Sequence, residues 1–204
     1  ICRRLEKFSD DVAKGLSPRL TILMPPRHGK SELASRMFPA WHLGRCPDHE
    51  IIACSYNVSL AMSFSKKVKE VLEDPAFHPV FDIRLNPNNQ SAEEWSIDRT
   101  RGGYVAAGVG GGITGKGAHL LIIDDPLKNA EEADSADTRE KLMDWYGSTA
   151  YTRLAPGGGV LVVQTWWHDS DLAGQLQTAM KDPLADQFVV VKYPAIAEED
   201  EYLD

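Results

Sequence analysis

The sequence predicts an α/β fold in which a mainly parallel central sheet is flanked by helices and extended by a small antiparallel hairpin. Two observations predict this fold. Apolar runs of strand length recur along the 204 residues, and segments with helical spacing of apolar residues separate several of them. Polar residues suited to phosphate and metal binding directly follow two of these runs, which is where ligands lie in open α/β sheets.

The N-terminal part of the chain predicts a helix followed by a buried strand. Leu5, Phe8 and Val12 recur at helical spacing within residues 1–14, and the apolar run 20–24 follows. Apolar runs bounded by turn residues predict further strands at 50–55, 118–126, 159–165 and 188–192. Helical patterns predict helices at 32–37, at 58–72 and from residue 169 onward.

The middle of the chain predicts the hairpin. Residues 75–89 have the composition of a loop, whereas 94–98 and 103–107 alternate like two short antiparallel strands. The polar turn Arg99-Thr-Arg-Gly102 joins them. Six glycines within residues 108–117 predict a mobile loop, either functional or a linker.

The stretch Pro25-Pro-Arg-His-Gly-Lys-Ser31 lies between a predicted strand and a predicted helix, the context of a phosphate-binding loop. Gly29 would let the backbone approach phosphate oxygens, Lys30 would lie on the β- and γ-phosphates of ATP as a solvent-facing charge, and Ser31 would ligate Mg²⁺. Gly-Lys-Ser or its Thr form arises by chance in roughly one chain in ten of this size. Met24 replaces a glycine of the full motif. The expected nucleotide-binding residues are Pro26, Arg27, His28, Gly29, Lys30, Ser31 and Glu32.

The apolar run 118–123 ends in Asp124-Asp125-Pro126, as expected for the strand that delivers a carboxylate to the metal ion. Asp124 is the expected Mg²⁺ ligand. Asp125 would orient or deprotonate the attacking water, with Glu131 or Glu132 as the alternatives. Alternatively, the three residues form an ordinary turn.

The strand 159–165 predicts the class of nucleotide-binding fold. This strand is expected to lie between the strand 20–24 and the strand that ends at Asp124. Such an extra strand, with the acidic Asp125 beside the metal ligand, indicates a P-loop NTPase of the ASCE (RecA-like) type. Gln164, Thr165 and His168 would then face the γ-phosphate and sense ATP against ADP. His168 has a purely structural alternative role.

Composition limits the other function classes. The net charge of −8 argues against a surface that grips nucleic acid over its whole extent, although Lys66-Lys67-Val-Lys69 and the Arg99/Arg101 pair could act locally. No apolar run approaches membrane-spanning length and no signal-peptide pattern is present, so a soluble, cytosolic protein is expected. Cys2, Cys46 and Cys54 predict reduced thiols without a disulfide or zinc site.

Four motifs together resemble a known family. They are Pro25–Glu32, Gly110–Ala118, Leu121–Pro126 and Gln164–His168, and in this order they resemble the N-terminal ATPase domain of phage terminase large subunits. The resemblance implies ATP hydrolysis with Mg²⁺, translocation of double-stranded DNA into a procapsid in the host cell cytoplasm, and a homo-oligomeric ring on the capsid that is a monomer when isolated. It also implies contacts with the portal protein and the small terminase subunit, and no membrane.

The resemblance further implies a domain division. Residues 1–197 would be the ATPase domain, and the acidic run 198–204 would begin a linker to a nuclease domain that this chain does not contain. The adenine-contacting segment of the family lies upstream of the phosphate loop and is expected to be truncated at Ile1.

The chain also departs from the family pattern. Many terminases have Asp-Glu where this chain has Asp124-Asp125, and Trp166 stands where close relatives have arginine. Hydrolysis also needs an arginine near the γ-phosphate. Arg27 is the candidate within the same chain, and Arg101 with Arg99 is the candidate reaching a neighbouring subunit. Two other functions remain open, namely another RecA-like nucleic-acid ATPase or helicase, and a nucleotide-binding assembly module with little hydrolysis.

Overall fold

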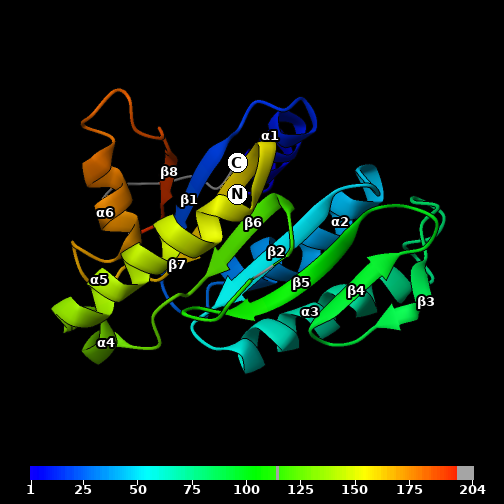
Figure 1. Cartoon of the computed structure of the whole chain (residues 1–204), viewed down its shortest axis with the longest axis horizontal. Helices are drawn as coiled ribbons and strands as arrows, with labels where there is room; N and C mark the ends of the chain where they lie inside the picture. The colour runs from blue at the N-terminus through cyan, green and yellow to red at the C-terminus, as the bar shows by residue number, and fades with distance from the viewer. Residues whose placement is uncertain (114, 197–204) are drawn as a thin grey trace.

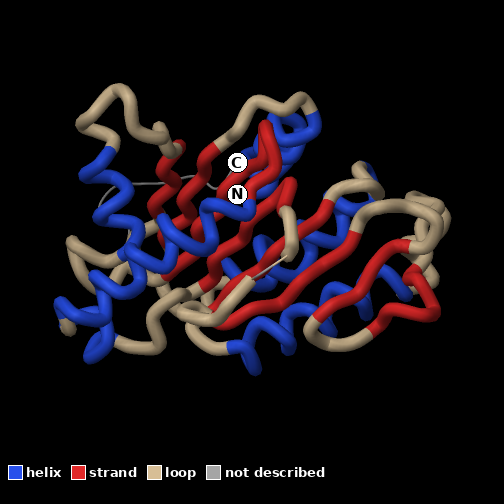
Figure 2. Tube along the Cα trace, in the orientation of Figure 1, coloured by secondary structure: helices blue, strands red, loops and turns tan. Residues whose placement is uncertain are grey.

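The computed structural model describes residues 1–113 and 115–196. Within these residues, eight strands form one sheet in the order β3-β4-β5-β2-β6-β7-β1-β8, with helices on both sides (Figures 1 and 2). The strands are β1 Arg19–Leu23, β2 Glu50–Ser55, β3 Leu85–Gln90, β4 Glu94–Ile97, β5 Gly103–Gly108, β6 Ala118–Asp124, β7 Leu154–Gln164 and β8 Val189–Lys192. The helices are α1 Cys2–Ala13, η1 Glu32–Met37, α2 Phe38–Arg45, α3 Val58–Glu73, α4 Ala130–Asp134, α5 Ala136–Trp145, η2 Tyr146–Ala150, η3 Tyr151–Arg153 and α6 Leu172–Ala179.

The sheet confirms the predicted fold class. Strands β5, β2, β6, β7, β1 and β8 are parallel, and β7 lies between β6 and β1 as the ASCE topology requires. β4 pairs antiparallel with β5, with Trp95 opposite Tyr104, and so confirms the predicted hairpin. The carboxyl ends of β1, β6 and β7 therefore meet at one edge of the sheet.

Two hydrophobic layers hold the helices against the sheet. On β6, Leu120 and Ile122 pack in one layer with residues of α1, α2 and α3, whereas Leu121 and Ile123 pack in the other with α5 and α6. All four side chains are completely buried. This burial on both faces explains why the central strands are continuous apolar runs.

Several elements differ from their predicted form. β3 occupies 85–90, where most residues were predicted to form a loop. The sequence Leu-Asn-Pro-Asn-Asn-Gln gave no strand signal because it lacks apolar alternation, and the strand pairs only with β4 at the sheet edge. α4 and α5 were not predicted, and β7 begins at Leu154 rather than residue 159. The segment 32–37 is π-helical and continues directly into α2.

Some sequence predictions fall outside the described residues or are only partly tested. The proposed linker 198–204 and the boundary at 197 lie beyond residue 196. All three cysteines are free; Cys54 is buried and Cys46 half-buried, whereas Cys2 is exposed. No helix in residues 1–113 and 115–196 combines the length and apolar character needed to cross a bilayer.

Candidate active site

The loop between β1 and η1 is held against β7 and contains two residues in left-handed backbone conformation. The Met24 N–H donates to the Gln164 carbonyl oxygen at 3.2 Å, which fixes the start of the loop. Gly29 has a φ of 83°, a conformation that glycine adopts readily. Arg27 has a φ of 64°, which is strained for a residue with a side chain. The backbone conformation thus accounts for glycine at position 29.

Lys30 is buried, with only 6% of its surface exposed, so the predicted solvent-facing position is wrong. Its Nζ lies 2.9 Å from the Asp125 Oδ2 atom and donates to the Thr165 Oγ1 atom at 3.2 Å. A buried ammonium group requires such partners because its desolvation is costly. Lys30 therefore joins the loop after β1 to the ends of β6 and β7.

Ser31 and Asp124 form the second link between the loop and β6. The Ser31 hydroxyl donates to the Asp124 Oδ1 atom at 3.0 Å, and Asp124 is 2% exposed. Burial, reinforced by the negative charge of Asp125, raises the pKa of Asp124 to about 6. Among the described residues, no group donates a hydrogen bond to the Asp124 Oδ2 atom.

This donor set fits a magnesium ion. Mg²⁺ prefers hard oxygen ligands, and the Ser31 hydroxyl and the Asp124 carboxylate supply such oxygens side by side. The buried Oδ2 atom without a hydrogen-bond donor is the kind of group that a cation or its water ligand satisfies. The two predicted metal ligands thus lie together in a suitable position.

Asp125 is held by the end of β7 and by Lys30. Its Oδ1 atom accepts the Thr165 backbone N–H at 2.9 Å, while Oδ2 pairs with Lys30. Its own N–H donates to the Val163 carbonyl oxygen at 2.8 Å, and its φ is 43°. The carboxylate is 28% exposed, so solvent can reach it.

The three predicted sensor residues do not all reach this group. Thr165 contacts both Lys30 and Asp125, and Gln164 is buried at the end of β7 with no hydrogen-bond partner for its Oε1 atom among the described residues. The His168 Nδ1 atom instead accepts the Ser170 N–H at 2.9 Å, within the turn that leads into α6. That contact supports the structural alternative for His168.

The remaining loop residues lie on the outer rim of the site. His28 is exposed, and its Nδ1 atom lies 2.8 Å from the Pro26 carbonyl oxygen. The Glu32 carboxylate accepts from the Arg36 guanidinium at 2.5 Å. Arg27 is exposed as well.

The second pair of candidate arginines lies before the amino end of β5, whereas the candidate site lies at the carboxyl ends of the parallel strands. Arg99 and Arg101 are in the turn before β5, whereas the glycine-rich loop follows the other end of β5 at Gly108. The turn and the glycine-rich loop therefore lie at opposite ends of β5, separated by the length of the strand. The Arg99 side chain is 91% exposed, and the Arg101 N–H donates to the Asp48 Oδ1 atom.

One residue of the site was not predicted from the sequence. Ser35 lies buried on the next turn after Ser31, near enough to the Asp124 carboxyl to lower its pKa, although the Ser35 hydroxyl has no hydrogen-bond partner among the described residues. The sequence could have indicated Ser35, because it lies four residues after Ser31 and residues four apart share one face of a helix.

Comparisons with known proteins identify the family of the chain. A family model described as "Terminase large subunit, T4likevirus-type, N-terminal" matches residues 21–202. Among solved structures, the HK97 bacteriophage large terminase is similar, with a TM-score of 0.60 and 18% sequence identity. That match covers 96% of this chain and 40% of the HK97 protein, so this chain spans less than half of its length. A comparison with curated proteins finds no match.

Proposed function

Because the chain belongs to the terminase large subunit family, through its match to the N-terminal model of that family, we propose that it is the ATP-hydrolysing motor domain that drives double-stranded DNA into a viral procapsid. One observation carries the proposal. The Lys30-Ser31 pair of the loop and the Asp124-Asp125 pair of β6, far apart in sequence, meet through direct contacts of 2.9 and 3.0 Å.

Lys30 is the proposed phosphate-binding charge. Its ammonium group is held by Asp125 and Thr165, so binding of ATP would exchange the Asp125 carboxylate for phosphate oxygens. The exchange keeps the buried ammonium paired, because one anion replaces another. Gly29 and the loop N–H groups would contact the same phosphates.

Asp125 is the proposed water-orienting residue. Once Lys30 turns to the phosphates, the Asp125 Oδ2 atom is free to accept a proton from water, while Oδ1 stays bonded to the Thr165 N–H. Ser31 and Asp124 would hold Mg²⁺, which when bound neutralises charge on the phosphate oxygens.

Thr165 is the proposed link between nucleotide state and β7. It accepts from Lys30 through its hydroxyl and donates to Asp125 through its backbone, so opening of the Lys30–Asp125 pair changes both of its contacts. Movement of this kind at the end of β7 could be passed along the adjoining turn toward α6. We propose Gln164, at the end of the same strand, as the second residue of this sensor.

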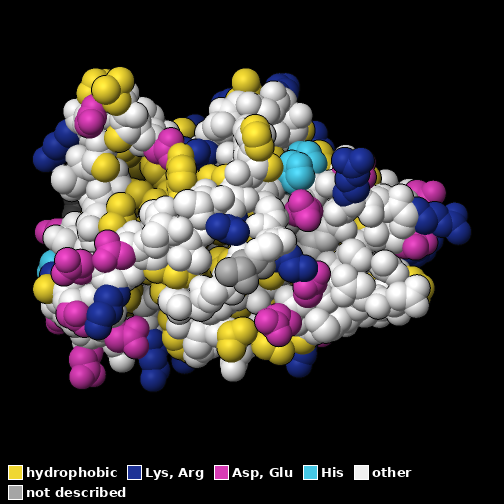
Figure 3. All heavy atoms as spheres, viewed as in Figure 1, with side chains coloured by type: hydrophobic (Ala, Val, Ile, Leu, Met, Phe, Trp, Pro, Cys, Tyr) yellow, Lys and Arg dark blue, Asp and Glu magenta, His cyan; other side chains and the backbone are white. Residues whose placement is uncertain are grey.

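The proposed partners are double-stranded DNA, the portal protein, the small terminase subunit and further copies of this chain in a ring, acting in the host cell cytoplasm. Charge restricts where DNA could bind, because Asp and Glu side chains gather over the α4 and α5 end of the molecule (Figure 3). Phosphate repulsion disfavours that surface. The nuclease of the intact protein would lie outside this chain.

An ATPase assay with Mg²⁺, with and without double-stranded DNA, tests the proposal. Turnover of ATP without separation of DNA strands is expected. Strand separation would instead support a RecA-like helicase, and tight ATP binding without turnover, even with DNA and assembled rings, would support a nucleotide-binding assembly module. Absence of both ATP and ADP binding would overturn the assignment.

A further inference from the structure

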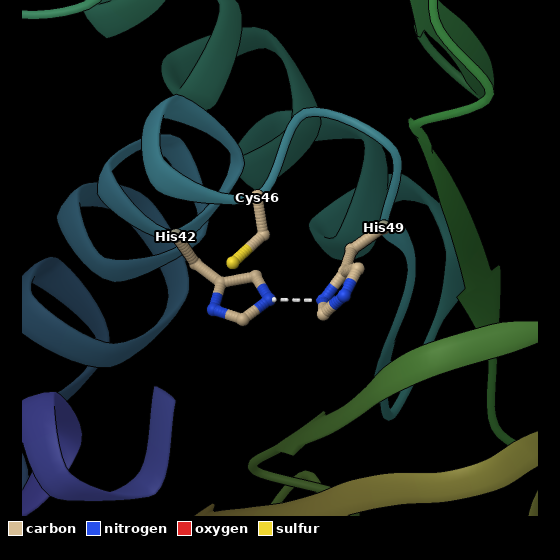
Figure 4. A group of neighbouring side chains, drawn as sticks. All are labelled: His42, Cys46 and His49. Atoms are coloured by element: carbon tan, nitrogen blue, oxygen red, sulfur yellow. Dashed lines mark hydrogen bonds between the residues drawn. The ribbon is translucent and has the colours of Figure 1, made fainter. Parts of the chain in front are cut away.

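A second group of side chains lies at the end of α2 and in the turn that enters β2. His42 lies on the last turn of α2, and Cys46 directly follows the helix. The His49 N–H donates to the Cys46 carbonyl oxygen at 3.0 Å, which turns the chain back. The three side chains point toward one another (Figure 4). One potential ligand atom from each lies within 4.8 Å of the other two.

The spacing of these atoms is close to that of a tetrahedral metal site. The His42 Nε2 and His49 Nδ1 atoms are 3.1 Å apart. Zinc bonds of about 2.0–2.1 Å to nitrogen and about 2.3 Å to sulfur place tetrahedral ligands roughly 3.3–3.7 Å apart. The Cys46 Sγ atom lies within 4.8 Å of a nitrogen of each histidine, so a small movement of this side chain would complete three of the four contacts.

Neighbouring groups orient the histidine rings. The His42 Nδ1 atom lies 2.8 Å from the Ser9 hydroxyl oxygen, which fixes the ring with Nε2 directed into the group. The His49 ring stacks on His119 with centroids 4.5 Å apart and planes inclined by 10°. Hydrogen bonding of the second ring nitrogen and packing of the ring are typical of metal-binding histidines.

The fourth ligand position is not filled by His119. Its Nδ1 atom accepts the Glu50 N–H at 3.1 Å, so in the neutral ring Nε2 carries the proton and has no lone pair for a metal. His49 and His119 line a cavity of about 590 Å³ together with Asp48, Glu50 and Arg101. Water in this cavity can supply the fourth ligand.

The alternative is a metal-free cluster. A His42–His49 hydrogen bond satisfies both nitrogens, and a protonated Cys46 thiol can remain half-buried. That arrangement leaves unexplained why a thiol and two oriented imidazoles converge on one point.

We propose that His42, Cys46 and His49 bind one zinc-class divalent ion, with water as the fourth ligand. On binding, Cys46 releases its proton to solvent, and two metal–nitrogen bonds replace the His42–His49 hydrogen bond. The ion would fasten the end of α2 to the start of β2 and, through Ser9, to α1. The proposal is independent of ATP hydrolysis.

Titration of the chelator-treated, reduced chain with Co²⁺ tests the site, because a cobalt–thiolate bond gives a charge-transfer absorption in the near ultraviolet. One Co²⁺ per chain is expected, displaced by Zn²⁺. Cys46→Ser should abolish the thiolate band, and His49→Gln should weaken binding by about 100-fold or more, beyond the loss typical of an orienting neighbour. Cys2→Ser and His78→Gln are matched controls outside the group and should bind as the unaltered chain does.

Thermal unfolding gives a second measurement. Zn²⁺ should raise the melting temperature of the unaltered chain and of the two controls, but not that of Cys46→Ser. Circular dichroism before titration shows whether each variant is folded. A folded, unaltered chain without a cobalt–thiolate band, or a Cys46→Ser variant with undiminished affinity, would overturn the proposal.

Discussion

The two ends of β6 carry polar groups of opposite character. At its carboxyl end lie the buried carboxylate of Asp124 and the partly exposed carboxylate of Asp125, which pairs with the buried Lys30 ammonium. At its amino end, His119 stacks on His49, and burial lowers the pKa of His42 to about 3, so that ring is neutral. The strand spans about 20 Å between them, at ~3.3 Å per residue.

The difference indicates which kind of ligand suits each end. The carboxyl end contains a buried carboxylate oxygen without a donor among the described residues and an ion pair that can exchange partners. The imidazole nitrogens at the amino end are neutral or occupied by hydrogen bonds. Anionic phosphates with Mg²⁺ suit the first arrangement, and a soft cation suits the second.

The largest effect is expected from Lys30→Ala, which removes the cation of the carboxyl end. ATP turnover should fall by about 10³-fold, because a charge contact in the transition state contributes several kcal/mol. The measurement is steady-state hydrolysis with Mg²⁺. Lys141→Ala is the control, since that side chain is 74% exposed on α5. A folded Lys30→Ala protein with unchanged turnover would remove the phosphate-binding assignment.

Asp125→Asn should separate binding from hydrolysis at the same end. ATP affinity should persist while turnover falls by about 10²-fold, because the amide cannot accept a proton from water. Equilibrium nucleotide binding and single-turnover hydrolysis measure the two effects, with Asp137→Asn as the exposed control. Normal hydrolysis would move the base elsewhere, with Glu131 and Glu132 as the next candidates.

The pH dependence of stability should distinguish the two ends without nucleotide. The pKa of Asp124 rises from 3.8 to about 6 on folding, so the folded chain holds this proton more tightly. Its stabilising contribution is complete below pH 3.8 and is lost as pH rises through about 6, by about 3 kcal/mol in total.

Urea unfolding in chelator across this pH range provides the measurement. Asp124→Asn should lack this part of the pH dependence and should be more stable than the unaltered chain at pH 7. Added Mg²⁺ should stabilise only the unaltered chain. An identical pH profile for both proteins would show that Asp124 is not the buried acid responsible.

The smallest effects are expected from the arginines. In the monomer, Arg27→Ala should lower turnover by about tenfold, less than the roughly 10³–10⁵-fold lost with a fully engaged arginine, because the Arg27 side chain is exposed. Arg101→Ala should lower it by less than about twofold, because Arg101 lies before the amino end of β5. Hydrolysis at dilute protein concentration measures both. A larger loss of turnover for Arg101→Ala would contradict the position of Arg101 at the end of the sheet opposite the candidate site.

Mixing tests a contribution from Arg101 to a neighbouring subunit. Arg101→Ala and Lys30→Ala proteins would be combined on capsids, where each supplies what the other lacks. Recovered turnover supports a shared site, and no recovery leaves Arg27 as the candidate.

Local sequence determined most of the candidate site. The order of strand, loop and helix around Gly29-Lys30-Ser31 predicted the loop at the end of β1, and the apolar run before Asp124 predicted the strand that brings this carboxylate to Ser31. Such patterns are readable because strand burial and loop conformation depend mainly on neighbouring residues. The position of β7 between β6 and β1 was inferred from the same motifs and is confirmed.

Tertiary structure alone decided which side chains share a contact. Lys30 was predicted to face solvent, but packing of β6 and β7 against the loop buries it between Asp125 and Thr165. The cysteines gave no metal pattern among themselves, since the partners of Cys46 are two histidines, one from a helix and one from the following turn. Contacts between segments depend on strand order and helix packing, which single-sequence periodicity does not encode.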